Sequence, residues 1–250
     1  MSPAGEVKPL PDRFAAGIGG TAPVSALWAH GSLALGDFQP GRSDLDLIAL
    51  TEAPPGRGQE QSLRRVHQEL QREMPLAEKL HCSYVARAEA GDPGRSHLTW
   101  AHGELLRRVV SPVSRRELHQ GGLALLGPAP AAVIPAVTDS ELADYIRGDL
   151  AGYWYPNAGQ AGLWLRGTWV DLGLLTFARA SVTLREGRLI TKREALGVLP
   201  GLGAPPAVVR DIYRRRYENP PPASERWRAE RGHQARTFLR AAISQLLVLG

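Results

Sequence analysis

The sequence predicts an α/β domain followed by an all-helical domain, on the basis of how its apolar residues are spaced. Before residue 136, short apolar runs with strand composition are separated by loops and by an amphipathic helical stretch. After that point the apolar residues recur every three or four positions almost throughout, which is typical of helices. We therefore expect two domains, residues 1–136 and residues 137–250.

The N-terminal domain opens with a lead-in rich in Pro, Gly and Ala, and strands are then marked by apolar runs and by alternation. Its main helix is marked by Leu63, Val66 and Leu70, and Pro75 ends it. The expected strands are 24–28, 44–50 and 80–86, with a strand or short helix at 104–110; the expected helices are 11–16, 59–74 and 115–124; and residues 87–103 and 127–135 are expected to be irregular.

The C-terminal domain is expected to be a bundle of helices. Ser140 is the expected N-cap of the first helix, and Leu142, Ile146 and Leu150 follow at intervals of four. Gly187 is expected to end the second helix, because glycine commonly follows the last helical turn. The remaining helices are expected at 162–185, 192–199, 206–217 and 225–249.

The composition restricts the classes of protein to which the chain can belong. A chain of 250 residues with 43% hydrophobic and 22% charged residues is typical of an ordinary soluble protein. Cys82 is the single cysteine, so no disulfide can form within the chain, and we expect a cytoplasmic protein. The N-terminus lacks the apolar core of a secretion signal, and prolines interrupt the longest apolar candidate, residues 122–137. We therefore expect neither secretion nor membrane insertion.

The formal net charge of +5 favours polyanionic ligands in general terms. An arginine-rich coding bias explains this charge equally well. The arginines that crowd residues 210–240 are interleaved with Glu218, Glu225 and Glu230, and no stacking motif or reading helix accompanies them. We therefore expect no nucleic-acid partner.

Residues 24–50, VSALWAHGSLALGDFQPGRSDLDLIAL, contain the chemistry around which the chain is organised. Alternation in the second strand puts Asp44 and Asp46 on one face, with Leu45 and Leu47 on the other. Two adjacent carboxylates on an apolar strand repel each other unless a cation neutralises them. The pair therefore indicates a hard divalent ion with oxygen ligands, such as Mg²⁺.

Gly31 and Ser32 lie a short loop before this pair and are suited to a phosphate. Glycine lets the backbone approach a phosphate without a Cβ in the way, and serine offers a hydroxyl and an N–H as donors. The alternative is that the aspartates only solvate an edge strand and that the Gly-Ser pair is an ordinary turn. The joint presence of the Gly-Ser pair, the spacing and the flanking strands favours the metal and phosphate site.

The stretch resembles the signature of the nucleotidyltransferase superfamily, a Gly-Ser pair followed about a dozen residues later by Asp-x-Asp. Within that superfamily it is most similar to the aminoglycoside 3''-adenylyltransferase branch. The resemblance implies a DNA polymerase β-like N-terminal domain with a mixed sheet, and a C-terminal helical bundle that closes over the active site. It also implies Mg²⁺ as cofactor and ATP as co-substrate, with the phosphates held by Gly31, Ser32 and Ser43.

The chain departs from the resembled family at the third strand. The family carries a third carboxylate there, which holds metal or acts as general base, and the matching position here is His81. Histidine takes up a proton near neutral pH and could act as base toward a substrate hydroxyl, although it binds Mg²⁺ less well than a carboxylate. The alternative is that His81 is structural and that transfer activity is weak or lost.

The helical half adds further residues by the same resemblance. In that branch an arginine, then a lysine thirteen residues later, then a tyrosine contact ATP from the helical domain. The matching residues here are Arg179, Lys192 and Tyr217, with Tyr213 as a competitor for the tyrosine. A guanidinium and an ammonium would hold the triphosphate, and an aromatic ring can pack on adenine or ribose.

We therefore expect an Mg²⁺-dependent enzyme, a monomer, that transfers AMP from ATP to a hydroxyl of a small molecule such as an aminoglycoside or aminocyclitol. Asp44 and Asp46 are the expected metal ligands and catalytic residues, together with His81. Because aminoglycosides are polycations, such acceptors need negative charge, and Asp171 and Glu104 are candidates. Two alternatives stay open: a nucleotide-binding pseudoenzyme or regulatory module, and an enzyme that AMPylates proteins.

Overall fold

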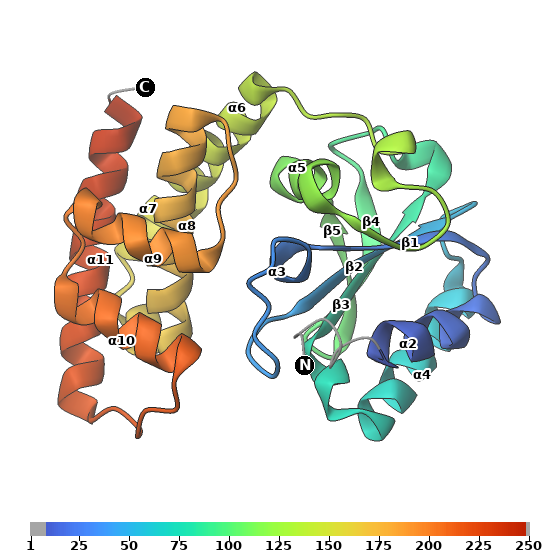
Figure 1. The fold of residues 1–250 in the computed structure, drawn as a ribbon, viewed down its shortest axis with the longest axis horizontal. Coiled ribbons are helices and arrows are strands. Elements are labelled where there is room, and N and C mark those ends of the chain that lie inside the picture. The colour runs from blue at the N-terminus through green and yellow to red at the C-terminus, as the bar shows by residue number, and fades with distance from the viewer. Residues whose placement is uncertain (1–8, 249–250) are drawn as a thin grey trace. The chain divides into compact units, whose positions relative to one another are not determined.

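The computed structural model describes residues 9–248 of the chain. The chain divides into two compact units, of which the first ends at Val137 and the second begins at Thr138 (Figure 1). The first unit contains all the strands of the sheet, and the second is built from helices. The predicted fold class, an α/β domain followed by an all-helical domain, is thus confirmed.

The first unit is built on a six-stranded mixed sheet in the order β5-β4-β3-β2-β1-β6. Only β2 and β3 run parallel among the described strand pairs, and the other neighbours are antiparallel. A helical crossover joins the parallel pair, as parallel strands require. The strands are β1 Val24–His30, β2 Leu45–Thr51, β3 Leu80–Ala86, β4 Ser96–Ala101, β5 Glu104–Val109 and β6 Leu123–Leu126.

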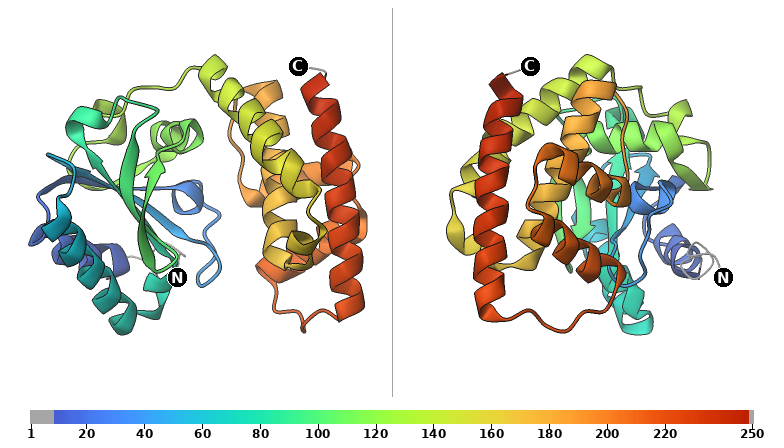
Figure 2. Two further views of the ribbon diagram at one scale, coloured as in Figure 1. Left: turned by 180° about the vertical axis from the view of Figure 1, so that it is seen from behind. Right: turned by 60° about the vertical axis from the view of Figure 1, so that its left-hand side comes forward.

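Helices pack on both faces of this sheet (Figures 1 and 2). On one face, Phe14 of α2 and Leu63 of α4 share a core with Leu47 of β2. On the other face, Leu118 of α5 packs with Ile48 of β2. The helices are α2 Pro9–Gly19, α3 Gly31–Ala34, α4 Arg57–Glu73 and α5 Pro112–Gly121, with short 3-10 turns at Pro75–Lys79, Arg87–Glu89 and Pro130–Ala132.

Two predictions for the first unit were wrong in part. Residues 87–103 were expected to be irregular, but β4 occupies Ser96–Ala101 and forms a hairpin with β5. The hairpin turn places His102 and Gly103 at φ values of 54° and 83°, which glycine tolerates well. The helix expected at 115–124 ends earlier, and β6 follows it as an edge strand beside β1.

The second unit is a bundle in which α11 packs along α8. Its first helix is capped by Thr138 rather than by Ser140, because the Thr138 hydroxyl accepts a hydrogen bond from the Glu141 N–H at 3.2 Å. The helix expected at 162–185 is a 3-10 turn followed by α8. The elements are α6 Asp139–Asp149, a π-helical turn Leu150–Trp154, α7 Tyr155–Ala158, 3-10 turns Ala161–Leu165 and Leu199–Leu202, α8 Gly167–Glu186, α9 Lys192–Val198, α10 Pro206–Tyr217 and α11 Glu225–Val248.

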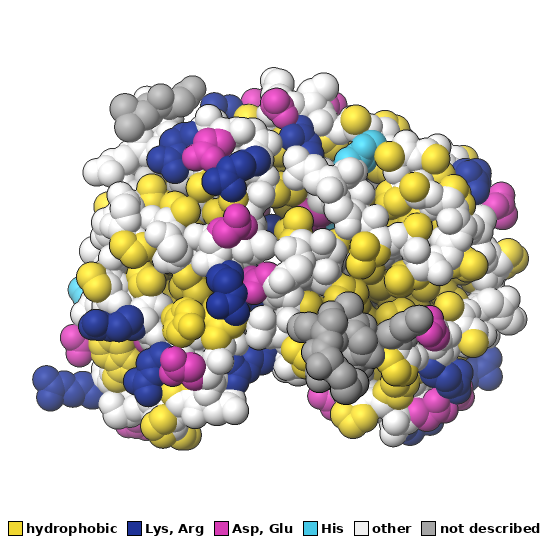
Figure 3. Space-filling model, in the orientation of Figure 1, with side chains coloured by type: hydrophobic (Ala, Val, Ile, Leu, Met, Phe, Trp, Pro, Cys, Tyr) yellow, Lys and Arg dark blue, Asp and Glu magenta, His cyan; other side chains and the backbone are white. Residues whose placement is uncertain are grey.

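The surface of the second unit mixes both signs of charge. On the face shown in Figure 3, its basic side chains alternate with acidic ones and do not form one continuous basic patch. Ion pairs such as Arg214 with Glu218 and Arg228 with Glu225 contribute to this pattern. None of the helices within residues 9–248 combines the length and the apolar character that a membrane crossing requires.

His67 gives the first unit a predictable acid sensitivity. This α4 side chain is 1% exposed, its Nε2 lies 2.7 Å from the Tyr84 hydroxyl, and its ring stacks on Trp100 at 4.5 Å. Burial lowers the pKa of His67 to about 3. The unfolded chain therefore binds a proton below about pH 6.5 that the folded chain does not bind, so stability falls as the pH falls.

We expect this histidine to remove roughly 2–3 kcal/mol from the free energy of unfolding between pH 7 and pH 4.5. Urea unfolding of the wild type and of His67→Gln at both pH values measures the effect. The variant is expected to be less stable at pH 7, because it loses the stacked ring, yet to lose less on acidification. If both proteins lost the same free energy of unfolding on acidification, the acid sensitivity would not be due to His67.

Candidate functional site

Three neighbouring strands place His30, Asp46 and His81 in one row across the sheet. His30 of β1 is the register partner of Asp46 in β2, and Asp46 is the register partner of His81 in β3. Residues paired in register point to the same face of a sheet. Asp44, two residues before Asp46, directly precedes the first residue of β2. The strand pairing thus gathers one aspartate and two histidines, with a second aspartate beside them.

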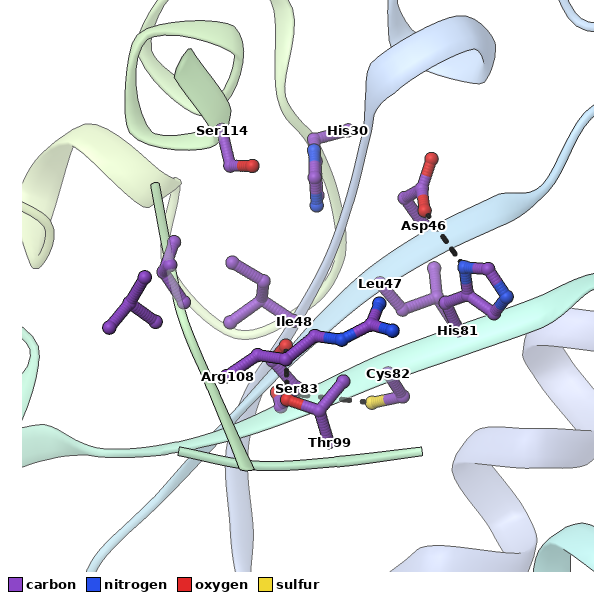
Figure 4. A pocket seen from close by; sticks show the side chains of 12 residues that line it. His30, Asp46, Leu47, Ile48, His81, Cys82, Ser83, Thr99, Arg108 and Ser114 are labelled. Carbon is purple, nitrogen blue, oxygen red and sulfur yellow. Dashed lines mark hydrogen bonds and ion pairs between the residues drawn. The ribbon is translucent and has the colours of Figure 1, made fainter. Parts of the chain in front are cut away.

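The predicted catalytic residues lie next to one another in this row. His81 Nδ1 lies 3.5 Å from Asp46 Oδ1, with the two side chains 14% and 34% exposed (Figure 4). The Lys79 ammonium lies 3.9 Å from Asp44 Oδ1. Both aspartates are therefore reachable from solvent, and His81 occupies the position beside Asp46 where the resembled family has a third carboxylate.

Gly31 lies directly against the Asp46 carboxylate. A Cβ on residue 31 would stand 2.8 Å from Asp46 Oδ2, and the residue has φ +64°, a left-handed conformation that side chains disfavour. The glycine is therefore required for two reasons: its conformation, and the room it leaves for a carboxylate. This contact joins the Gly-Ser pair to the aspartate pair in space, as the spacing predicts.

Replacing Gly31 by alanine tests this contact, and Gly36 supplies the control. Gly31→Ala should displace Asp46 and lower kcat/KM for nucleotide transfer by roughly 100-fold, because misplaced groups lose that much in an oriented site. Gly36 has a similar φ of +75°, but nothing lies within 4 Å of an added Cβ. Gly36→Ala should therefore cost stability without a comparable loss of activity. Equal losses of activity in both variants would refute the contact argument.

The sequence prediction missed the pair formed by His30 and Glu117. His30 Nδ1 lies 3.0 Å from Glu117 Oε2, and the two side chains are 12% and 8% exposed. Burial lowers the pKa of His30, but the hydrogen bond to Glu117 and the charges of Asp46 and Glu117 outweigh burial and raise it overall. The position of His30 directly before Gly31 was a usable signal, whereas no sequence pattern connects it to Glu117 on α5.

A second neighbour that the sequence prediction missed is His102, which lies in the segment expected to be irregular. Its ring centroid lies 4.7 Å from that of His81, in an edge-on arrangement. Partial burial lowers the pKa of His102, and the positive charges of His81, Arg108 and Lys79 act in the same direction. The hairpin turn between β4 and β5, which sequence reasoning did not find, is what brings this histidine to the site.

Ser32 and Ser43 differ in their surroundings. Ser32 is partly exposed directly after Gly31. Ser43 is 1% exposed, and its Oγ accepts a hydrogen bond from the Gln39 N–H at 3.0 Å. Ser43 therefore supports the loop before β2, and Ser32 is the more exposed of the two serines.

Within the second unit, the three residues matched to the family's ATP contacts lie on elements that meet. The Arg179 Nε donates to the Ile190 carbonyl at 2.8 Å, which ties α8 to the segment leading into α9. Lys192 begins α9, where Thr191 and Glu194 form a capping box. The guanidinium of the next residue, Arg193, lies 4.0 Å from the centroid of the Tyr217 ring. The three residues thus lie on elements of the bundle that contact one another, through Arg179 with Ile190 and through Arg193 with Tyr217.

The donor set fits a magnesium ion that is shared with a nucleotide. Among residues 9–248 no group of three or more His, Cys, Asp or Glu side chains is suited to hold a metal ion alone. Mg²⁺ is commonly bound by one or two carboxylates together with substrate phosphates, and it keeps several waters. Asp44 and Asp46 supply carboxylate oxygens of this kind, and Gly31 places no side chain against the Asp46 carboxylate.

Comparison with protein families decides the class of this domain. Residues 19–90 match the family model described as "Nucleotidyltransferase domain". This segment of the first unit is similar to a nucleotidyltransferase domain. The matched segment includes Gly31, Asp44, Asp46 and His81. The expected resemblance to the nucleotidyltransferase superfamily is confirmed, and so is the expectation of an enzyme of the nucleotidyltransferase type.

Comparison with solved structures extends the likeness in fold to the whole chain. A crystal structure of spectinomycin adenyltransferase AAD(9) from Enterococcus faecialis with ATP and spectinomycin matches with a TM-score of 0.70. The match covers 96% of this chain and 98% of that one at 12% sequence identity. The nucleotidyltransferase domain and the helical unit therefore share the fold of that adenylyltransferase. A search of curated proteins found no match.

Proposed function

We propose that this protein is an adenylyltransferase that moves AMP from ATP to a hydroxyl group of a small molecule, with Mg²⁺ as cofactor. The observation that carries the proposal is the contact between Gly31 and the Asp46 carboxylate, with His81 on the other side of Asp46. In this proposal Gly31 leaves room for a phosphate, Asp46 binds the metal ion, and His81 accepts a proton; the three residues are neighbours. These are the parts that phosphoryl-type transfer needs.

In this proposal Asp44 and Asp46 hold the metal ion, which neutralises charge on the phosphates when it is bound. Gly31 lets the phosphates approach Asp46, and Ser32 donates hydrogen bonds to them. His81 accepts the proton of the attacking hydroxyl through its imidazole. His30, fixed by Glu117, supports the row from the β1 side. The attacking oxygen forms a bond to the α-phosphorus, and pyrophosphate leaves with the electrons of the broken bond.

The helical unit is proposed to contribute Arg179, Lys192 and Tyr217 to the nucleotide. A guanidinium and an ammonium are complementary to the negative charge that develops on departing pyrophosphate. The tyrosine ring offers a surface for adenine or ribose. We also propose that the chain acts as a monomer in the reducing cytoplasm, where Cys82, which is 0% exposed, stays a thiol.

The test is a pyrophosphate-release assay with ATP and a panel of hydroxyl acceptors that includes spectinomycin and other aminocyclitols. Mass spectrometry should show an acceptor that gains one AMP group. Calorimetry with ATP, with and without Mg²⁺, measures binding separately. Metal-dependent binding without release under every acceptor would favour the alternative reading, a nucleotide-holding regulatory module in which His81 replaces the catalytic carboxylate. Labelled ATP that marks a protein band in lysate would favour protein AMPylation.

A further inference from the structure

The site opens into a small pocket on the same face of the sheet. It has a volume of about 140 Å³ and is bounded by β1 to β5 and the start of α5 (Figure 4). Whole drug-sized ligands occupy pockets of roughly 300–1,000 Å³, so this one suits one group of a ligand with the atoms next to it. Its polar lining residues are His30, Asp46, His81, Ser83, Thr99, Arg108 and Ser114.

The pocket lies on the side from which an acceptor would enter. The Gly31-Ser32 pair follows β1, whereas half of the residues that line the pocket come from β3, β4 and β5, on the other side of β2. In-line displacement requires the attacking and the leaving oxygens on opposite sides of the phosphorus. With phosphates at Gly31 and Ser32, the acceptor hydroxyl therefore approaches past His81. This direction of approach rests on the proposed function, which places the phosphates at Gly31 and Ser32.

Apart from its two histidines, the pocket is lined by two ionisable polar residues of opposite charge, Asp46 and Arg108. Asp46 is the one carboxylate among the lining side chains, and the proposed metal ion neutralises it. Arg108 of β5 extends across the pocket with its guanidinium toward Asp46 and His81 (Figure 4). The Arg108 side chain is exposed, and among the residues that the structure describes none forms a side-chain hydrogen bond or an ion pair with its guanidinium. The nucleotide-loaded pocket therefore presents an uncompensated guanidinium to the acceptor.

Neutral donors and acceptors complete the lining. The hydroxyls of Ser83 and Thr99 lie 3.0 Å apart, and Thr99 Oγ1 also donates to the His97 carbonyl at 3.2 Å. His97, behind this pair, is 3% exposed, and its carboxylate neighbour Glu89 is ion-paired with Arg95. An ammonium in this pocket would face Arg108 with no free lining carboxylate, whereas an oxyanion would form charge-assisted hydrogen bonds.

We propose that the acceptor carries a carboxylate or phosphate group close to the hydroxyl that is adenylylated, and that Arg108 is the specificity-determining residue that binds this group. This acceptor class differs from the polycationic aminoglycosides that the family resemblance implies. Asp171, the acid considered for a cationic acceptor, is instead bound to Arg215 by contacts of 2.5 and 2.7 Å.

The test compares small sugars that share hydroxyl groups and differ in charge: glucose, glucosamine, glucuronate and glucose 6-phosphate. Binding to the full chain with Mg²⁺ and a non-hydrolysable ATP analogue is measured by calorimetry, and transfer by pyrophosphate release. We expect an acidic sugar to bind at least tenfold more tightly than glucose or glucosamine. The two acidic sugars distinguish a carboxylate from a phosphate.

Arg108→Gln should weaken binding of the preferred acidic sugar by roughly 10- to 100-fold, the usual range for a hydrogen bond to a charged group, and leave glucose unchanged. The matched control is Arg107→Gln, because Arg107 precedes Arg108 on β5 but pairs with Glu60 of α4 at 3.2 Å. The control should bind acidic sugars as the wild type does.

Three results would overturn the proposal: equal affinity for neutral and acidic sugars, tighter binding of glucosamine or spectinomycin, or a loss in Arg108→Gln that appears in the affinity for ATP instead. Binding that depends on Arg108 without pyrophosphate release from any acceptor would support the anion pocket and count against adenylyl transfer. Release with a neutral or cationic acceptor that Arg108→Gln leaves unchanged would support transfer and refute the pocket assignment.

Discussion

Replacing Asp44 and Asp46 together by asparagine is expected to abolish adenylyl transfer, with a fall in kcat/KM of roughly 10³-fold or more, because metal-assisted charge stabilisation is worth several kcal/mol. Both side chains are partly exposed, at 40% and 34%, so the change leaves the core intact. Removing two adjacent like charges also relieves their repulsion. The variant is therefore expected to be folded and at least as stable as the wild type in the absence of metal.

Two measurements separate lost chemistry from lost fold. Wild-type protein should gain thermal stability when Mg²⁺ and ATP are added together, since a ligand that binds the folded state stabilises it, and the double variant should lose this gain. Asp92→Asn is the control, because the Asp92 side chain accepts a hydrogen bond from the Gly94 N–H at 2.8 Å, which an amide oxygen can also accept, and Asp92 does not line the pocket. Transfer by the double variant above one tenth of the wild-type rate would contradict the assignment.

The row around Asp46 was predictable in part because strand alternation is a local rule. Asp44 and Asp46 could be placed on one face from the sequence, and Gly31 could be connected to them through the resemblance. His81 could be matched to the third position because β3 has a clear apolar pattern. The pairing of Asp46 with His81 then follows from the parallel register of β2 and β3.

Other parts of the site depend on contacts that no local pattern encodes. Glu117 lies on a helix 87 positions after His30, and only the packing of α5 on the sheet brings the two side chains within 3.0 Å. Arg108 and His102 belong to the hairpin formed by β4 and β5. The sequence analysis did not predict this hairpin, because Gly91, Pro93 and Gly94 suggested a long loop. Alternation in β4, where Leu98 and Trp100 are buried on one face, was the signal that could have revealed it.

In the helical unit, too, residues close in sequence could be matched, whereas contacts between distant helices could not be predicted. Arg179 and Lys192 are close in sequence, and the turn after α8 brings Ile190, two residues before Lys192, into contact with Arg179. The network around Asp211 joins α10 to α11, and Arg215 extends it to Asp171 of α8. Its carboxylate accepts hydrogen bonds from Trp227 at 2.9 Å, Arg215 at 2.8 Å and Arg231 at 3.0 Å. The sequence analysis grouped these arginines as one basic segment. In the structure, Arg231 is buried and Arg215 is partly buried.

Asp211→Ala is accordingly expected to destabilise the helical unit by about 3–5 kcal/mol, the usual cost of leaving a buried charge without its partner. Arg231 is 3% exposed, and its Nε already lacks a hydrogen-bond partner. Arg215 would keep Asp171, so the loss falls mainly on Arg231. Chemical unfolding followed by circular dichroism measures the change. Glu225→Gln is the control, because that carboxylate is 94% exposed in its pair with Arg228 and should matter little.

A second variant shows whether the unpaired charge is the cause. If the loss comes from the unpaired charge of Arg231, combining Asp211→Ala with Arg231→Met should recover much of the lost stability. An apolar side chain of similar length needs no counter-charge. The recovery should be absent when Arg231→Met is replaced by Arg214→Met, since Arg214 lies at the surface and pairs with Glu218. Additive losses in the first double variant would mean that Asp211 acts through Trp227 or Arg215 instead. In that case the contact between α10 and α11 would depend on the indole hydrogen bond rather than on the buried ion pair.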